Sequence, residues 1–312
     1  MTGIACFGEV LWDVFQIDSD DPTRFVFELG GAPANVASTL GKLGCNAYIV
    51  GSVGRDRFGR QLTEKLERDG VDCRYLAMLP ERTGLAFVFR DEAGEPSFLF
   101  YRRETADMSY RAGMLPKRFP KLSLALVGTS TSVDDELREA THVFLERAQK
   151  AGAEVVLDLN VRAHLWSSRA AMLRETRNLA ASAALIKASS ADLEALGKDV
   201  AWLKKVAPRA VVVLTRGKGA AEVLGPFGRI AVPTKPRKVV DATGAGDAFL
   251  SGIFAAHAAA QSSPIWERTP AFWKKAVSLG HLLAAQAVSS AGATSGIKRL
   301  AQARRFLEEL RP

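Results

Sequence analysis

The sequence has few cysteines and no apolar run long enough to cross a membrane. Its three cysteines, Cys6, Cys45 and Cys73, are widely spaced and form no C-x-x-C pair, so neither a disulfide framework nor a zinc site is expected. Glu9 and Asp13 interrupt the first apolar segment, and no basic region precedes it, which is unlike a secretion signal. We therefore expect a protein of the reducing cytoplasm with no membrane partner.

Long basic runs are missing as well. The net charge is +8, but lysine and arginine are spread along all 312 residues, so we expect no nucleic-acid partner. The excess is interpreted as solvated surface that also favours anionic substrates. The content of 47% hydrophobic and 24% charged residues is that of an ordinary globular protein with a large core.

Several signatures of other α/β enzymes are absent. No G-x-G-x-x-G follows the first strand-like segment and no G-x-S-x-G occurs, which argues against a nicotinamide dehydrogenase and a serine hydrolase. The segment 54–61 has the spacing of a Walker A loop, but Arg60 and Gln61 stand where lysine and serine or threonine would hold phosphate and magnesium. We reject it as a P-loop.

The stretch Asp241–Asp247 precedes an apolar segment with helical periodicity. Helices leave their first amides unpaired, and Gly244, Ala245 and Gly246 have almost no side chain to keep a phosphate away from those amides. Asp247 has two interpretations. It is either an ordinary acidic residue at a helix N-terminus or a general base that takes a proton from a hydroxyl beside the bound phosphoryl group.

A second glycine-rich turn, 30–37, leads into a predicted helix that continues to about Leu43. Asn35 in its first turn either caps the backbone or binds a ligand held against Gly31. Asp13 lies inside a strand-like run between apolar neighbours. It either faces solvent or binds substrate hydroxyls, and the local sequence does not choose between the two.

Two pairs of strands are expected before residue 105. The runs 10–15 and 24–29 flank a turn at 18–22, and the runs 84–90 and 97–102 flank a turn at 91–96. The second pair is unusually aromatic. It either fills an ordinary sheet face or forms a lid that closes over a ligand or another subunit. We expect one domain over 1–312 with a lid from about 10–30 and 84–105.

From residue 122 onward, predicted strands and helices alternate. The strands are expected at 122–127, 155–159, 184–188 and 210–214, and the helices at 133–150, 170–180, 191–196 and, later, 272–289. Repeated βα units predict a mostly parallel sheet wrapped by helices, with ligands at the carboxyl ends of the strands.

Polar residues and glycines gather after these strands and form a plausible rim for nucleotide and magnesium. They are Asp158, Asn160, Arg162, Lys187, Ser189, Thr215, Gly217 and Gly219. His281, in the alanine-rich last predicted helix, is interpreted by default as a packed or capping histidine.

Both glycine motifs, with Gly44 and Gly54 between them, resemble the two signatures of the ribokinase-like (PfkB) carbohydrate kinases. The opening around Glu9 and Asp13, the stretch Phe100–Arg102, and the segment 160–162 with Trp166 resemble the fructokinase branch. The resemblance covers nearly the full length. It implies a three-layer α/β/α fold with a mostly parallel sheet and a small β-lid, and a homodimer formed through that lid.

The resemblance also implies site residues, with ATP as the phosphoryl donor and Mg²⁺ as the charge neutraliser. Asp247 would be the base beside the amides of Gly244, Ala245 and Gly246. The sugar would contact Asp13, Gly31, Asn35, Tyr101 and Arg162. The nucleotide would lie along Lys187, Ser189, Thr215, Gly217, Gly219 and His281. A K⁺ ion would lie near Asp241, Thr243, Ala291 and Gly296.

The chain departs from the family pattern in a few places. Ala242 replaces a larger residue, Ser189 and Asp192 replace Asn-x-x-Glu, and the 217–219 turn is one residue short. The expected reaction is phosphorylation of fructose to fructose 6-phosphate. The alternatives are a kinase of ribose, 2-keto-3-deoxygluconate or a nucleoside, and a non-catalytic sugar or nucleotide sensor.

Overall fold

The computed structural model describes residues 2–16, 21, 23–90, 96–217, 219–235, 239–260, 263–290, 292–297 and 300–310. Most of the two turns expected at 18–22 and 91–96 lies outside these ranges. None of the helices in the described ranges has the length and apolarity needed to cross a lipid bilayer.

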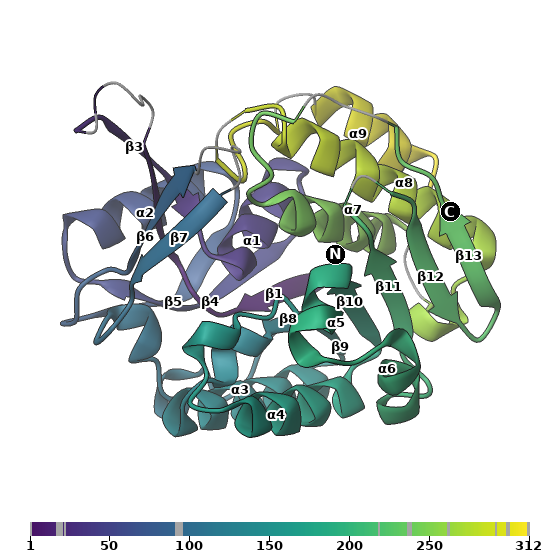
Figure 1. Ribbon diagram of the computed structural model, residues 1–312, viewed down its shortest axis with the longest axis horizontal. Helices are drawn as coiled ribbons and strands as arrows, with labels where there is room; N and C mark the ends of the chain where they lie inside the picture. Colours follow the sequence, from purple (N-terminus) through teal and green to yellow (C-terminus); the bar gives the residue numbers. More distant parts are fainter. Residues whose placement is uncertain are drawn as a thin grey trace.

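A large sheet forms the centre of the molecule (Figure 1). Within the described ranges it has nine strands in the order β13-β12-β11-β10-β9-β8-β1-β4-β5. All neighbours from β11 to β5 pair in parallel, whereas β12 and β13 are antiparallel. The strands are β1 (Gly3–Phe7), β4 (Ala47–Gly54), β5 (Asp72–Leu79), β8 (Leu122–Gly128), β9 (Glu154–Asp158), β10 (Leu185–Ser189), β11 (Val211–Thr215), β12 (Ala221–Gly225) and β13 (Gly228–Val232).

Helices cover both faces of this sheet and bury a separate apolar core on each. On one face lie α1 (Ala32–Lys42), α2 (Arg57–Arg68), α7 (Ala245–Ala259), α8 (Pro270–Ala287) and α9 (Leu300–Glu308). On the other lie α3 (Asp135–Lys150), α4 (Arg169–Ser182), α5 (Ser190–Leu196) and α6 (Val200–Val206). The central strands read as continuous apolar runs because both their faces are covered.

A smaller four-stranded sheet stands beside the large one, next to α1 and α2 (Figure 1). Its order is β3 (Phe25–Gly30), β2 (Leu11–Gln16), β6 (Leu85–Arg90), β7 (Pro96–Tyr101). Asp13 pairs with Glu28 on one side and with Ala86 on the other, and Ala86 pairs with Phe100. Residues paired across a sheet share a face, so Asp13, Glu28 and Phe100 lie on one face of the small sheet.

The three-layer α/β/α fold predicted from the sequence is confirmed. Both expected strand pairs form, and every strand and helix expected from 122 to 214 is present within two residues of its predicted ends. Five of the described α-helices and strands have no counterpart in the sequence-based prediction. They are β5, α6, α9, β12 and β13, of which the last two form an antiparallel hairpin at the edge of the large sheet.

Candidate active site

The glycine turn before α7 has the geometry of an anion cradle. Gly244 is the N-cap of α7 with φ 71°, and as a glycine it offers no side chain to cap the first amides. A Cβ atom at Gly244 would lie 2.1 Å from the Cβ of Ala293, so no larger residue fits here. The Ala245 amide donates to the Ala242 carbonyl at 3.2 Å. The Gly246 amide follows at the positive end of the helix dipole. The first turn therefore leaves backbone donors for a phosphate.

Asp247 lies in the first turn of α7, and its side chain is buried from solvent. Asn35 of α1 donates a hydrogen bond of 2.8 Å from its Nδ2 to Oδ2 of Asp247. Burial and then the charge of Asp158 raise the pKa of Asp247 to about 6, against the opposing effects of Asn35, Lys187 and Arg162. A carboxylate with such a pKa is ionised at neutral pH and is a stronger base than an exposed one.

Asp13 faces the same space from the small sheet. Burial raises its pKa well above the ordinary value, and Asp247, Asp241 and Glu9 add to the shift, while Arg162 opposes it. Gly30 packs directly against this side chain, because a Cβ atom there would lie 2.5 Å from the Asp13 carboxyl carbon.

Gly31, the N-cap of α1, has φ 95°, and a Cβ atom there would lie 2.2 Å from the carbonyl oxygen of Glu9. Glu9 itself accepts hydrogen bonds from the Ala32 amide (3.4 Å) and from Ser130 Oγ (3.1 Å). Gly31 is therefore required by the close approach of the Glu9 backbone, and Gly30 by the close approach of the Asp13 side chain. These two adjacent glycines join the small sheet to α1.

Lys187, in the middle of β10, brings a positive charge to the cradle. Its Nζ lies 3.0 Å from Oδ1 of Asp158, and both side chains are buried. The same Nζ would lie 2.9 Å from a Cβ atom at Gly246. Burial opposes the charged form of Lys187, but Asp158, Asp192 and Asp247 outweigh it and raise the pKa. The ammonium group is therefore held in its charged form beside the backbone donors.

Ser189 and Thr215 are directly paired at the ends of β10 and β11. Ser189 forms a capping box with Asp192 at the start of α5, and the other oxygen of Asp192 accepts from the Val161 amide at 2.7 Å. Asp192 therefore fixes the loop that carries Arg162. Arg162 lies close enough to Asp13, Asp158 and Asp247 to lower the pKa of each.

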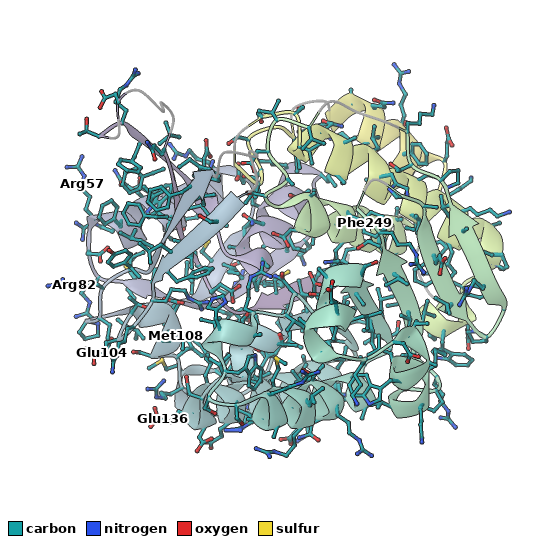
Figure 2. The ribbon with its side chains drawn as sticks, viewed as in Figure 1. Arg57, Arg82, Glu104, Met108, Glu136 and Phe249 are labelled. Atoms are coloured by element: carbon teal, nitrogen blue, oxygen red, sulfur yellow. The ribbon has the colours of Figure 1, made fainter. Side chains whose placement is uncertain are left out.

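Gly217 and Gly219 follow β11, and Gly217 has φ 55° with open space around its Cα. His281 lies on α8, where its Nε2 hydrogen-bonds with the Val232 carbonyl (3.1 Å) and its ring packs on Phe249 of α7. Phe249 is labelled in Figure 2. These contacts agree with a packed histidine. Its assignment to the nucleotide stays a prediction.

Asp241 joins the turn before α7 to the loop after α8. Its Oδ1 accepts from the amide and hydroxyl of Thr243, and its Oδ2 accepts from the Gly292 amide at 3.1 Å. Gly296 packs against the Gln286 carbonyl, from which a Cβ atom would be 2.1 Å away. Asp241 and Thr243 therefore lie on the loop before α7, and Gly296 lies on the loop after α8. The hydrogen bond between Asp241 and Gly292 joins the two loops. Ala291 lies outside the described residues.

Tyr101 does not join the other predicted sugar contacts. It pairs with Leu85 on the face of the small sheet opposite to Asp13 and is 58% exposed. The neighbouring residue, Phe100, shares the face of Asp13 and stacks on His164 with ring centroids 5.2 Å apart. Sequence reasoning missed both rings. Successive side chains of a strand point to opposite faces of the sheet. Once the strands are aligned on Asp13, this alternation places Phe100, and not Tyr101, on the face of Asp13.

The family model described as "pfkB family carbohydrate kinase" matches residues 1–299, so the chain belongs to this family. It is therefore a phosphotransferase that acts on an alcohol group. Fructokinase-1 of Oryza sativa subsp. japonica is 34% identical over 262 residues, which cover 80% of this chain and 81% of the relative.

Two solved structures have the same fold over nearly their whole length. The fructokinase of Xylella fastidiosa with bound ATP is 28% identical, has a TM-score of 0.88, and covers 98% of each chain. The fructokinase of Vibrio cholerae O395, in its fructose, ADP and calcium ion bound form, is also 28% identical with a TM-score of 0.88. It covers 98% of this chain and 99% of its own.

Proposed function

We propose that this chain is a fructokinase that transfers the γ-phosphoryl group of ATP to D-fructose and forms fructose 6-phosphate. The observation that carries the proposal is the position of Asp247. It lies in the first turn of α7, bonded to Asn35 and electrostatically coupled to Asp13 and Lys187. The names of the relatives and the fructose and ADP in the Vibrio cholerae structure support fructose as the acceptor.

The polar groups around Asp13 suit a polyhydroxylated acceptor. The carboxylates of Asp13 and Asp247 accept hydrogen bonds from hydroxyl groups, and Arg162 and the backbone at Gly31 lie beside them. Asn35 gives its Nδ2 to Asp247, while its buried Oδ1 has no hydrogen-bond partner among the described residues. A buried acceptor without a partner costs free energy, and a sugar hydroxyl would supply the missing donor. The predicted contact Tyr101 lies on the opposite face of the small sheet, so Phe100 is better placed than Tyr101 to pack against the sugar.

Phosphoryl transfer depends mainly on positioning and on neutralising charge. The amides of Gly244 and Gly246 and the ammonium of Lys187 would hold the transferred group. The amide of Ala245, which was also predicted to contact it, donates to the Ala242 carbonyl at 3.2 Å. Asp247 would accept the proton of the attacking hydroxyl. The nucleotide would extend from Lys187 along Ser189, Thr215, Gly217 and Gly219, with His281 further along it.

Magnesium fits this site as an ion that arrives with the nucleotide. Among the residues that the structure describes, no three His, Cys, Asp or Glu side chains are grouped to hold a metal. Both oxygens of Asp192 already accept backbone amides. Phosphate oxygens and water would therefore supply most of the ligands, as Mg²⁺ prefers. When bound, the ion neutralises charge on the phosphates.

We also propose a K⁺ site between the two loops that Asp241 joins, with backbone carbonyls near Thr243 and Gly296 as ligands. Both carboxylate oxygens of Asp241 accept protein donors, so carbonyls are the groups left to bind the ion. Replacing K⁺ by a large organic cation in the assay buffer should lower kcat if this site exists.

The small sheet would act as a lid and as the contact between two subunits. Its face away from Asp13 carries exposed apolar side chains, including Phe27, Leu99 and Tyr101. A patch of this kind marks an interaction surface. Closing the opposite face over the sugar would exclude water and suppress ATP hydrolysis.

An acceptor panel tests the proposed function. ADP release is measured with fructose, ribose, 2-keto-3-deoxygluconate and a nucleoside at equal concentration, and the fructose product is identified by its position of phosphorylation. We expect the highest kcat/KM with fructose and a phosphate on O6. A higher kcat/KM for another acceptor would reassign the substrate, and binding without turnover of any acceptor would indicate a sensor.

A further inference from the structure

The loop 292–297 contacts Glu28 of the small sheet. Ser295 donates a hydrogen bond of 2.6 Å from its Oγ to Oε2 of Glu28. Gly292 packs on the same side chain, since a Cβ atom there would lie 2.7 Å from Glu28 Cγ. Glu28 is the direct cross-strand neighbour of Asp13 and lies on the same face of the sheet. The loop therefore contacts the strand pair that carries the proposed sugar ligand.

The same loop forms one wall of the phosphate cradle. Its Gly292 amide donates to Asp241 Oδ2 at 3.1 Å. Its Ala293 is buried against Gly244, where a Cβ atom would come within 2.1 Å of the Ala293 side chain. Any shift of Ala293 therefore changes the space that is available to the N-cap of α7. Packed contacts of this kind transmit displacements because they leave no free volume.

A third contact fixes the middle of the loop. Lys42, at the end of α1, donates from Nζ to the Thr294 carbonyl at 3.1 Å, and its Nζ is 3.6 Å from Asp69. The loop is thus held from α1, from the turn before α7 and from the small sheet. The contacts with α1 and with the turn before α7 stay within the layers that surround the large sheet. The Glu28 contact is different, because it crosses to the sheet that carries Asp13.

We propose that Glu28 is a positioning residue that couples sugar binding on the small sheet to the geometry of the phosphate cradle through Ser295 and Ala293. The inference rests on the proposed function, because it assigns the coupling to a sugar kinase. A sugar that binds Asp13 fixes β2 and, through the paired strand, fixes Glu28. The hydrogen bond to Ser295 then holds Ala293 against Gly244, and the first amides of α7 take the position that the phosphoryl group needs.

Coupling between two ligands is a measurable free energy, and it is reciprocal. If Glu28 transmits the coupling, bound fructose lowers the dissociation constant of a non-hydrolysable ATP analogue in the wild-type protein. We expect a factor of roughly ten, which is within the usual range of such couplings. Removing the contact should abolish this factor while each ligand alone binds as before. A purely structural role would instead lower the melting temperature and leave the coupling factor unchanged.

The variants follow from the contact itself. Ser295→Ala removes the donor and Glu28→Ala removes the acceptor, while Ser295→Thr keeps the hydroxyl. Ser289→Ala is the matched control, because the Ser289 hydroxyl donates within its own turn to the Gln286 carbonyl. We expect kcat to fall about tenfold in both disruptive variants, as for the loss of one hydrogen bond to a charged group. The double variant should be no worse than either single one. Ser295→Thr should recover most of the loss and Ser289→Ala should behave as wild type.

The affinity of the ATP analogue is measured by calorimetry with and without saturating fructose. Amide hydrogen exchange of the segment 242–248 is measured in the ligand-free protein and does not depend on which sugar is the substrate. We expect faster exchange there in Ser295→Ala and Glu28→Ala than in Ser289→Ala. If fructose is not phosphorylated but exchange rises as expected, the proposed substrate is wrong and the contact role stands. Wild-type coupling, kcat and exchange in both disruptive variants would overturn the inference.

Discussion

At the scale of single residues, Asp247 is the group on which the chemistry depends. Burial disfavours its charge, as does the neighbouring Asp158, while Asn35, Lys187 and Arg162 favour it. The balance leaves a carboxylate that is ionised at neutral pH but is more basic than usual. Environments that shift a pKa toward the working pH are typical of general bases.

The first prediction concerns pH. Asp247 acts in its ionised form, and protonation on the acid side of a pKa of about 6 removes it. The value of kcat/KM for the sugar should therefore fall about tenfold per pH unit below that point and level off above it. Steady-state rates between pH 4.5 and 8.5 provide the test, with recovery at pH 7.5 as a control for unfolding. A flat profile down to pH 4.5 would mean that another group is the base.

The second prediction concerns stability. Because the pKa of Asp247 is raised in the folded protein, folding disfavours the ionised form. Ionised Asp247 therefore destabilises the folded protein. This destabilisation is absent below the pKa of the unfolded state, grows as the pH rises through about 6, and is fully present at pH 7.5. A shift of about two pKa units corresponds to roughly 2–3 kcal/mol. Asp247→Asn should therefore raise the melting temperature at pH 7.5 and do so less at pH 4.5. A lower melting temperature at both pH values would contradict the assigned environment.

At the scale of elements, the turn before α7 is the most constrained part of the site. Gly244 combines a positive φ with direct contact to Ala293. Substitution by alanine adds backbone strain and a steric clash at the same position.

The third prediction follows from this contact. Gly244→Ala should lower the free energy of unfolding by more than 1 kcal/mol, since both effects add, and should reduce kcat more than sugar binding. Gly113→Ala is the control, because a Cβ atom there meets no atom within 4 Å. Urea unfolding and steady-state kinetics of both variants provide the comparison. Equal stability and activity in the two would rule out a constrained cradle.

The sequence predicts the elements that carry the two glycine motifs, because glycine, a helical apolar period and an acidic residue are local signals. It does not predict the hairpin of β12 and β13. These strands are short, and their turn at 226–227 follows a long stretch in which neighbouring βα units suggest a parallel strand instead. Local patterns do not show which strands meet at the edge of a sheet.

The side-chain contacts of the site depend on strand pairing, and the sequence motifs alone do not contain it. Asn35 and Asp247 were each predicted, but their hydrogen bond requires α1 and α7 to lie side by side. Tyr101 was predicted as a sugar contact, although the register with Asp13 places Phe100, and not Tyr101, on the side of the site. The contact of Lys187 with Asp158 likewise depends on the neighbouring positions of β9 and β10.

At the scale of the whole molecule, sheet topology brings distant residues together. The parallel strands β9, β10 and β11 end at one edge, where α1 and α7 begin, and the small sheet faces the same space (Figure 1). The opposite face of the small sheet stays partly uncovered, with Phe27 42% and Tyr101 58% exposed.

The fourth prediction concerns assembly. If a second copy covers this face, the wild-type protein sediments as a dimer, and Phe27→Ser combined with Tyr101→Ser shifts it toward the monomer. The sugar KM should rise in the monomer because the lid loses its support. Sedimentation velocity over a range of concentrations measures the shift. A wild-type monomer at all concentrations would exclude the dimer.

The most direct measurement of the catalytic role of Asp247 is the turnover of Asp247→Asn, which keeps the shape of the side chain and its contact with Asn35 but removes the base. We expect kcat with ATP and fructose to fall by roughly 10²-fold or more, while the dissociation constant for fructose changes little. Near wild-type turnover in this variant would contradict the assignment of Asp247 as the general base.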